Sequence, residues 1–312
     1  MVDWLGLTRF VHIGGSVLLA AIFAFRRVVL NPAIASVRGG KYTASLGSCF
    51  DRLAFWGWMT VVCSGFVWFG LVAASVAGED SLLAIRPETL ELILFRTQFG
   101  QLWLFRFGCS LVLGVLFFSR SSGSIHGLFA MVILASLAGA GHAGAHSSIA
   151  GLPALAGDIG HLVAAALWPG GLVPLILFLR TETRAADAED WSLVADVIRR
   201  FSNTSLVVVA FLAGTGILNA CFMVRSPEAL FVTGYGQLLL LKISLFFLML
   251  GFAGWNLLVL KPCVIRLASV HKKPNLPEPI ALLVRNVVCE TVLAAFVLLV
   301  VGFLGVTPPP VH

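Results

Sequence analysis

Continuous apolar stretches recur along the chain, each of about 20 residues, which is the length an α-helix needs to cross a hydrocarbon layer roughly 30 Å thick. Short segments that carry most of the charged residues separate them. The stretches do not alternate between polar and apolar positions, as strands of a membrane barrel do, and an isolated strand would leave its backbone unpaired in lipid. The pattern therefore predicts an all-α, polytopic membrane bundle.

Eight membrane-spanning helices are predicted, and the whole chain is expected to form one integral membrane domain. The expected spans are 4–25, 53–77, 100–118, 125–144, 154–179, 204–224, 237–260 and 284–306. We interpret the first stretch as a retained span, because no basic region precedes it and it ends in Arg26-Arg27 rather than at a small-residue cleavage site.

Composition agrees with this class of protein. The 312 residues are 59% hydrophobic and 12% charged, with a mean hydropathy of +0.97, whereas a soluble domain carries about 25% charged residues. The net charge of +6 does not indicate a nucleic-acid partner, because the basic residues are scattered over the loops between apolar stretches. The expected partner of this surface is the lipid bilayer.

The basic residues predict the orientation. Fifteen Lys and Arg residues fall in the loops of one side, and three, Arg86, Arg96 and Arg225, fall in the loops of the other. By the positive-inside rule the first side is cytoplasmic. Both termini are therefore expected on the extracytoplasmic side.

An internal repeat is expected, with a first half over residues 1–150 and a second over 151–312. Residues 97–106 and 233–242 both read T-x-aromatic-G-Q-L-x-L-x-basic. Offsets of 148 to 151 also align Arg52 with Arg200, Gly65 with Gly216 and His12 with His161. Because each half has four expected spans, the two copies would enter the membrane from the same side and form a parallel 4+4 repeat.

Ionisable residues within the spans are the main candidates for function. Each costs on the order of 2.5–3.5 kcal/mol at the centre of a bilayer, so each needs a partner or a role. Arg9 and His12 share one helix face of the first span, and Asp158 and His161 share one face of the fifth. A structural role in helix packing is the alternative for each.

Two further histidines, His142 and His146, follow the fourth span at a spacing of four residues. With His12 and His161 they are expected to converge within roughly 12 Å of the outer boundary. Neutral imidazole binds copper, zinc, iron and nickel, so the four histidines are candidate metal ligands. Asp158 is expected either to orient an imidazole or to pair with Arg9.

Other polar and sulfur-containing residues complete the set. Arg106 and Lys242 are expected in the histidine layer, and Glu290 closer to the inner face. Cys221 and Met223 are candidate soft ligands if they face inward. Paired imidazoles on neighbouring helices are also how a b-type haem is held, so a haem-binding electron-transfer protein stays open as an alternative. A non-transporting membrane partner of a periplasmic protein is a second one.

The chain resembles the copper resistance protein D (CopD) family of bacterial inner-membrane proteins. The resemblance is strongest over about residues 199–309. Its motifs are Arg200-Phe201-Ser202, Thr215-Gly216, Thr233-x-Tyr235-Gly236, Lys242, Asn256, Glu290 and Pro308-Pro309, with Gly141-His142-Ala143 and Trp168-x-Gly170-Gly171 further upstream. Asn256 is followed by Leu257, where a basic residue is common in the family.

What the resemblance implies is movement of copper ions inward across the bacterial inner membrane, beside a separate periplasmic carrier of the CopC type. An enzyme is not expected, and no nucleotide-binding glycine loop of the Walker type occurs.

Overall fold

A computed structural model describes residues 2–36, 43–79, 85–119, 123–140, 152–185, 191–223, 227–268 and 278–308. Within these ranges every regular element is a helix. The α-helices are α1 (Val2–Phe25), α2 (Asn31–Ser36), α3 (Ala44–Ala77), α4 (Pro87–Arg96), α5 (Gln98–Phe118), α6 (Gly123–Ala135), α7 (Leu152–Ala165), α8 (Leu172–Ala185), α9 (Ser192–Met223), α10 (Pro227–Val232), α11 (Gly234–Trp255), α12 (Lys261–Ala268) and α13 (Glu278–Leu304).

Short segments of other helical types connect several of these. A 3₁₀ segment, η3 (Ser136–Ala140), follows α6. Three π-helical segments are η1 (Arg26–Leu30), η6 (Ala166–Gly170) and η7 (Asn256–Leu260), and each joins two α-helices into one longer rod. π-helical turns inside α-helices are rare and often mark functional positions.

Seven helical rods in the described ranges are long and apolar enough to cross a membrane, which confirms the polytopic helical class. They are Asp3–Ser36, Ala44–Ala77, Gln98–Phe118, Leu155–Thr183, Ser192–Leu218, Gly234–Leu267 and Glu278–Leu304. The remaining expected span, 125–144, corresponds to the shorter apolar helix Gly123–Gly139, and its last residues lie outside the described ranges.

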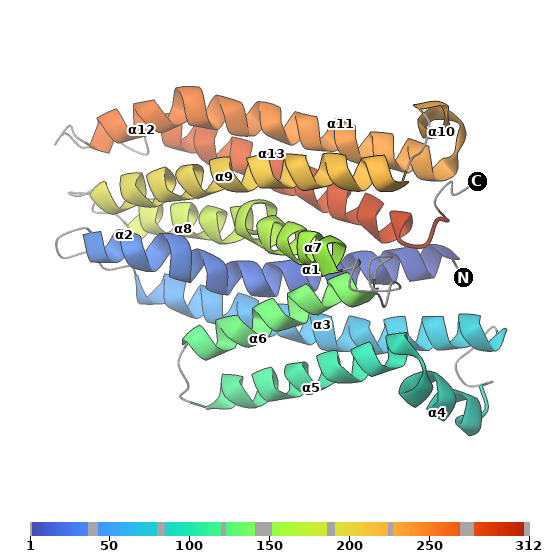
Figure 1. Ribbon diagram of the computed structural model, residues 1–312. Helices are drawn as coiled ribbons and strands as arrows, with labels where there is room; N and C mark the ends of the chain where they lie inside the picture. Colours follow the sequence, from blue (N-terminus) through green and yellow to red (C-terminus); the bar gives the residue numbers. More distant parts are fainter. Residues whose placement is uncertain are drawn as a thin grey trace.

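The long helices lie side by side, and α1 begins at the same end of the bundle as α13 ends (Figure 1). The short helices α4 and α10 also lie at this end, whereas α2 and α12 lie at the other (Figure 1). A chain that crosses the bundle an even number of times begins and ends at the same end, as expected for eight spans.

Helix α1 is the central helix, because it packs against α3, α6, α13 and η6. In the rod Asp3–Ser36, which contains most of α1, 72% of the most apolar segment is buried. The corresponding share is 11% in the rod Gly234–Leu267, which contains α11. Large apolar side chains cover the outside of the bundle, among them Phe118 at 82% exposed and Val232 at 81%. Such a surface suits lipid, and a soluble protein rarely exposes apolar side chains on this scale.

Candidate functional site

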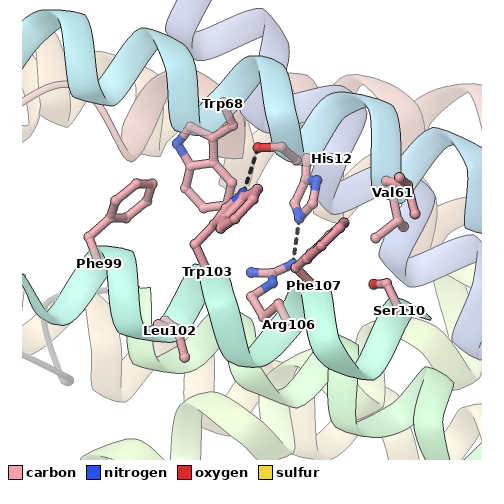
Figure 2. Close-up of a pocket in the computed structure, with 11 residues that line it drawn as sticks. His12, Val61, Trp68, Phe99, Leu102, Trp103, Arg106, Phe107 and Ser110 are labelled. Atoms are coloured by element: carbon pink, nitrogen blue, oxygen red, sulfur yellow. Dashed lines mark hydrogen bonds between the residues drawn. The ribbon is translucent and has the colours of Figure 1, made fainter. Parts of the chain in front are cut away.

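His12 lies on the buried face of α1 and is held from two neighbouring helices. Its Nδ1 is 2.9 Å from the Ser64 hydroxyl of α3. Its Nε2 is 2.5 Å from Nη2 of Arg106 on α5, a contact that Figure 2 shows as a dashed line. The guanidinium group can only donate, so Nε2 accepts and Nδ1 carries the proton. The Ser64 oxygen accepts a hydrogen bond from this N–H, because its own hydroxyl donates to the Thr60 carbonyl. His12 is therefore a neutral imidazole of defined tautomer.

Aromatic side chains surround this cluster. The Trp68 ring lies 5.2 Å from the His12 ring, and Trp103 donates from Nε1 to the Gly65 carbonyl at 2.9 Å. Phe99 and Phe107 complete the wall around Arg106 (Figure 2). His12 and Arg106 are thereby largely shielded from bulk solvent, at 3% and 6% exposed. Electrostatic interactions are stronger in such surroundings than in water.

His161 of α7 has a similar arrangement in the second half of the chain. Its Nδ1 is 2.8 Å from the Thr215 hydroxyl of α9, which itself donates to the Phe211 carbonyl at 2.8 Å. Nδ1 therefore carries the proton, and the Nε2 lone pair, which no described residue engages, is the one a ligand would use. Lys242 of α11 and His161 lie close enough to interact electrostatically, and Asp158 acts on Lys242 in the same way.

The two histidines thus have the same kinds of partner in the same order along the chain. In each half a histidine of the first helix bonds a hydroxyl of the next long helix, and a basic residue of the third lies beside it. Ser64 and Thr215 did not figure among the predicted site residues. Each directly precedes one of the two glycines that the offsets align, Gly65 and Gly216, and this position is the signal that could have identified them.

The structure does not bring the predicted ligands into one described cluster. The hydrogen-bond partners of His12 lie on α3 and α5, whereas that of His161 lies on α9. No group of three or more His, Cys, Asp or Glu side chains that could hold a metal occurs in the described ranges. His142 and His146 lie outside these ranges, and so do the side chains of Cys221 and Met223 at the end of α9.

Arg9, one turn before His12, lies against the same aromatic wall. Its guanidinium carbon is 5.2 Å from the centre of the Trp68 ring, and that of Arg106 is 5.8 Å from the same ring. Cation–π contacts of this kind stabilise a buried guanidinium group. Two cationic groups therefore meet around one tryptophan and one neutral histidine.

Glu290 belongs to a separate polar network in the second half. Its carboxylate accepts a hydrogen bond of 2.6 Å from Asn256 of η7, and Asn256 in turn accepts one of 3.0 Å from Asn286. Glu290 is 2% exposed, and with Trp168 and Ser205 it is among the residues that line a cavity of about 180 Å³. Asn256 thus forms the interhelical hydrogen bonds expected of an intramembrane amide.

A helical membrane bundle with two hydroxyl-oriented histidines, one buried and one partly buried, is the class of protein that these features define. Oriented imidazoles with Nε2 as the acceptor are typical of metal-binding histidines, whose other ring nitrogen donates a hydrogen bond to a supporting group. Comparison with known families narrows this class. The model described as "Copper resistance protein D" matches residues 195–304, and that described as "Copper resistance protein D-like, N-terminal domain" matches residues 1–152.

The chain belongs to the copper resistance protein D family. It is 30% identical over 208 residues to the copper resistance protein D of Pseudomonas syringae pv. tomato, a match that covers 65% of this chain and 66% of the relative. It is 32% identical over 172 residues to the inner membrane protein YebZ of Escherichia coli (strain K12), covering 54% and 57%.

A third relative is the copper transport protein CutJ of Bacillus subtilis (strain 168), with 42% identity over 93 residues. That match covers 30% of this chain and 17% of the relative. The matched stretches thus span less than two thirds of the length of each of these relatives. A search of solved structures found no match. The family and the helical bundle together identify a multi-pass protein of the bacterial inner membrane.

Proposed function

We propose that this protein moves copper ions inward across the bacterial inner membrane, and that copper enters through the histidine layer in the extracytoplasmic half. The family supports copper as the cargo. The observation that carries the proposal is the tautomer of His12 and His161, because each histidine presents Nε2 as a ligand nitrogen while a hydroxyl holds Nδ1. His142 and His146 are the proposed entry ligands, and Cys221 and Met223 are proposed soft ligands.

In this proposal Arg106 takes the place of the copper ion at His12 when no copper is bound. Its guanidinium group occupies the Nε2 lone pair of His12 that a copper ion would need. Copper binding at His12 therefore requires Arg106 to turn away, and its return would expel the ion toward the next site. Lys242 lies beside His161 and would act in the same way, with Asp158 attracting the displaced ammonium group.

The remaining polar residues have supporting roles in the proposal. Arg9 contacts Trp68 and limits the positions open to Arg106. Glu290 and its cavity are proposed to lie on the later, cytoplasmic part of the path. A separate periplasmic carrier of the CopC type would deliver the copper, because the proposed ligands His142 and His146 follow a span on the extracytoplasmic side.

Copper accumulation in cells tests the ligand assignment. Cells that express the single variants His12→Ala, His142→Ala or His161→Ala should accumulate several-fold less copper than cells with the unaltered protein, at equal amounts of protein in the membrane. His271→Ala is the matched control, because the sequence places His271 in a basic loop outside the spans. Unchanged accumulation in all three variants would refute the assignment.

The same Nε2 atoms would also ligate haem iron, so the visible spectrum of the purified protein separates the two functions. Copper transport predicts no strong Soret band. A stoichiometric Soret band that is lost in His12→Ala and His161→Ala would favour the electron-transfer alternative.

A further inference from the structure

The two terminal nitrogens of the Arg106 guanidinium group differ in their hydrogen bonding. Nη2 bonds His12, whereas Nη1 is fully buried and has no hydrogen-bond partner in the described ranges. A buried cationic donor without a partner costs several kcal/mol, so such an atom calls for a ligand. The free end points along the cavity, toward the side on which Leu102 and Phe99 lie (Figure 2).

A second cationic group strengthens the positive field at this place. Arg9 has a buried Nε that lacks a hydrogen-bond partner among the described residues, and its guanidinium group shares the Trp68 ring with that of Arg106. In the described part of the chain, the ion pairs that form are Arg26 with Asp51 and Asp196 with Arg199 and Arg200. Neither Arg9 nor Arg106 is among them, so no described carboxylate neutralises these two charges.

The cavity beside Arg106 is small and is lined mainly by aromatic and apolar side chains. Its volume is about 30 Å³, and His12, Trp68, Trp103 and Arg106 are among its lining residues. On this measure one water molecule needs about 10–15 Å³. The cavity therefore has room for two water molecules or for one ion of the size of chloride.

We propose that this cavity binds one halide-sized anion, with chloride as the physiological ligand and Nη1 of Arg106 as its main donor. The positive charges of Arg106 and Arg9 favour an anion over a cation, and the dry aromatic walls strengthen the attraction. The bound anion would satisfy Nη1 and hold Arg106 in its contact with His12. The proposal does not depend on copper transport.

Thermal unfolding of the purified full-length protein tests this directly. Unfolding temperatures are measured in sodium chloride and in sodium gluconate at equal ionic strength, over a range of concentrations. A ligand that binds only the folded state stabilises it, so chloride should raise the unfolding temperature saturably, by at least about 2 °C relative to gluconate. Bromide should act like chloride.

The variant Arg106→Gln should lose this difference between chloride and gluconate. Arg26→Gln is the matched control, because Arg26 pairs with Asp51 away from the cavity, and it should keep the difference. Equal unfolding temperatures of the unaltered protein in the two salts would overturn the proposal. A chloride effect that persists in Arg106→Gln would overturn it as well.

Because Arg106→Gln could fail to fold, tryptophan fluorescence of the unaltered protein supplies a second test. Trp68 and Trp103 line the cavity, out of 8 tryptophans in the chain. Bromide bound beside them should quench part of the fluorescence saturably, and added chloride should reverse this part by competition. Quenching that rises linearly with bromide and is insensitive to chloride would show collisions only, and would contradict a bound anion.

Discussion

The hydroxyl groups of Ser64 and Thr215 decide which ring nitrogen of His12 and of His161 carries the proton. Each hydroxyl proton is committed to a carbonyl one turn earlier in its own helix, at Thr60 and Phe211. The hydroxyl oxygen is then an acceptor for the histidine Nδ1–H. A serine or threonine hydroxyl thus determines the tautomer of an imidazole on a neighbouring helix.

We predict that Ser64→Ala destabilises the protein by about 1–3 kcal/mol, because it leaves the buried Nδ1–H of His12 without an acceptor. The measurement is the shift in unfolding temperature of the purified protein in detergent. Ser64→Thr keeps the acceptor and should recover most of the loss.

Ser48→Ala is the control for this change, since Ser48 is an exposed residue of the same helix whose hydroxyl bonds only the Ala44 carbonyl. It should shift the free energy of unfolding by less than about 0.5 kcal/mol. If Ser64→Ala were as mild as Ser48→Ala, the hydroxyl would not be holding His12.

At the level of single residues the sequence predicted part of the candidate site. The cost of burying charge singled out His12, His161, Arg106 and Lys242, and helix spacing placed them at one depth. The sequence does not predict the hydrogen bond between Arg106 and His12. That contact depends on how α1 and α5 pack, which the hydropathy pattern does not determine. Sequence alone does not predict that Ser64 and Thr215 orient the histidines, because a hydroxyl in an apolar helix usually bonds its own backbone.

Among the elements, the connections α4–α5 and α10–α11 are built alike. In each, a threonine side chain accepts a hydrogen bond of 3.0 Å from the amide of a glycine three residues on, at Thr97–Gly100 and Thr233–Gly236. In each, a glutamine, Gln101 or Gln237, donates a 3.0 Å bond to a carbonyl of the preceding short helix. These shared bonds support the parallel internal repeat that we propose from the sequence.

Gly100 and Gly236 allow the short helices to approach this closely. A Cβ atom at Gly100 would collide with the carbonyl oxygens of Ile93 and Leu94, and one at Gly236 with that of Ala229. We therefore predict that Gly100→Ala and Gly236→Ala each destabilise the protein by about 1–3 kcal/mol, since the backbone must shift to make room.

Gly108→Ala and Gly234→Ala are the matched controls, because a Cβ atom at either position meets nothing within 4 Å. Gly108 lies inside α5, where alanine is favoured over glycine by about 0.5–1 kcal/mol, so that variant should be neutral or stabilised. Unfolding temperatures of the four variants provide the comparison. If Gly100→Ala and Gly108→Ala lowered the unfolding temperature equally, the shared glycine of the two connections would have no structural role.

Helix existence followed from hydropathy, but helix length did not. The span expected over 204–224 belongs to α9, Ser192–Met223, and the span expected over 53–77 to α3, Ala44–Ala77. Hydropathy identifies only the part of a helix that suits hydrocarbon, whereas helices continue into the polar interface, where charged residues such as Asp196 find partners. Hydropathy does not indicate the π-helical segments, but prolines mark all three: Pro169 lies inside η6, and Pro32 and Pro262 follow η1 and η7 by two residues.

For the whole molecule, the shared end of α1 and α13 agrees with an even number of crossings (Figure 1). The charge of the loops predicts that the C-terminus is extracytoplasmic. We therefore predict that a C-terminal fusion to alkaline phosphatase is active and that a C-terminal fusion to green fluorescent protein is dark. Fusions after Lys273, in a basic loop, should give the opposite result. Fluorescence from the C-terminal fusion would contradict the proposed orientation.

Copper uptake by the purified protein in proteoliposomes tests the central claim most directly. Vesicles with the unaltered protein should accumulate radioactive copper faster than empty vesicles, and the double variant His12→Ala, His161→Ala should lower the initial rate at least tenfold. Ser48→Ala should leave it unchanged. Copper uptake no faster than in empty vesicles, or equal rates for the unaltered protein and the double variant, would contradict transport through the two oriented histidines.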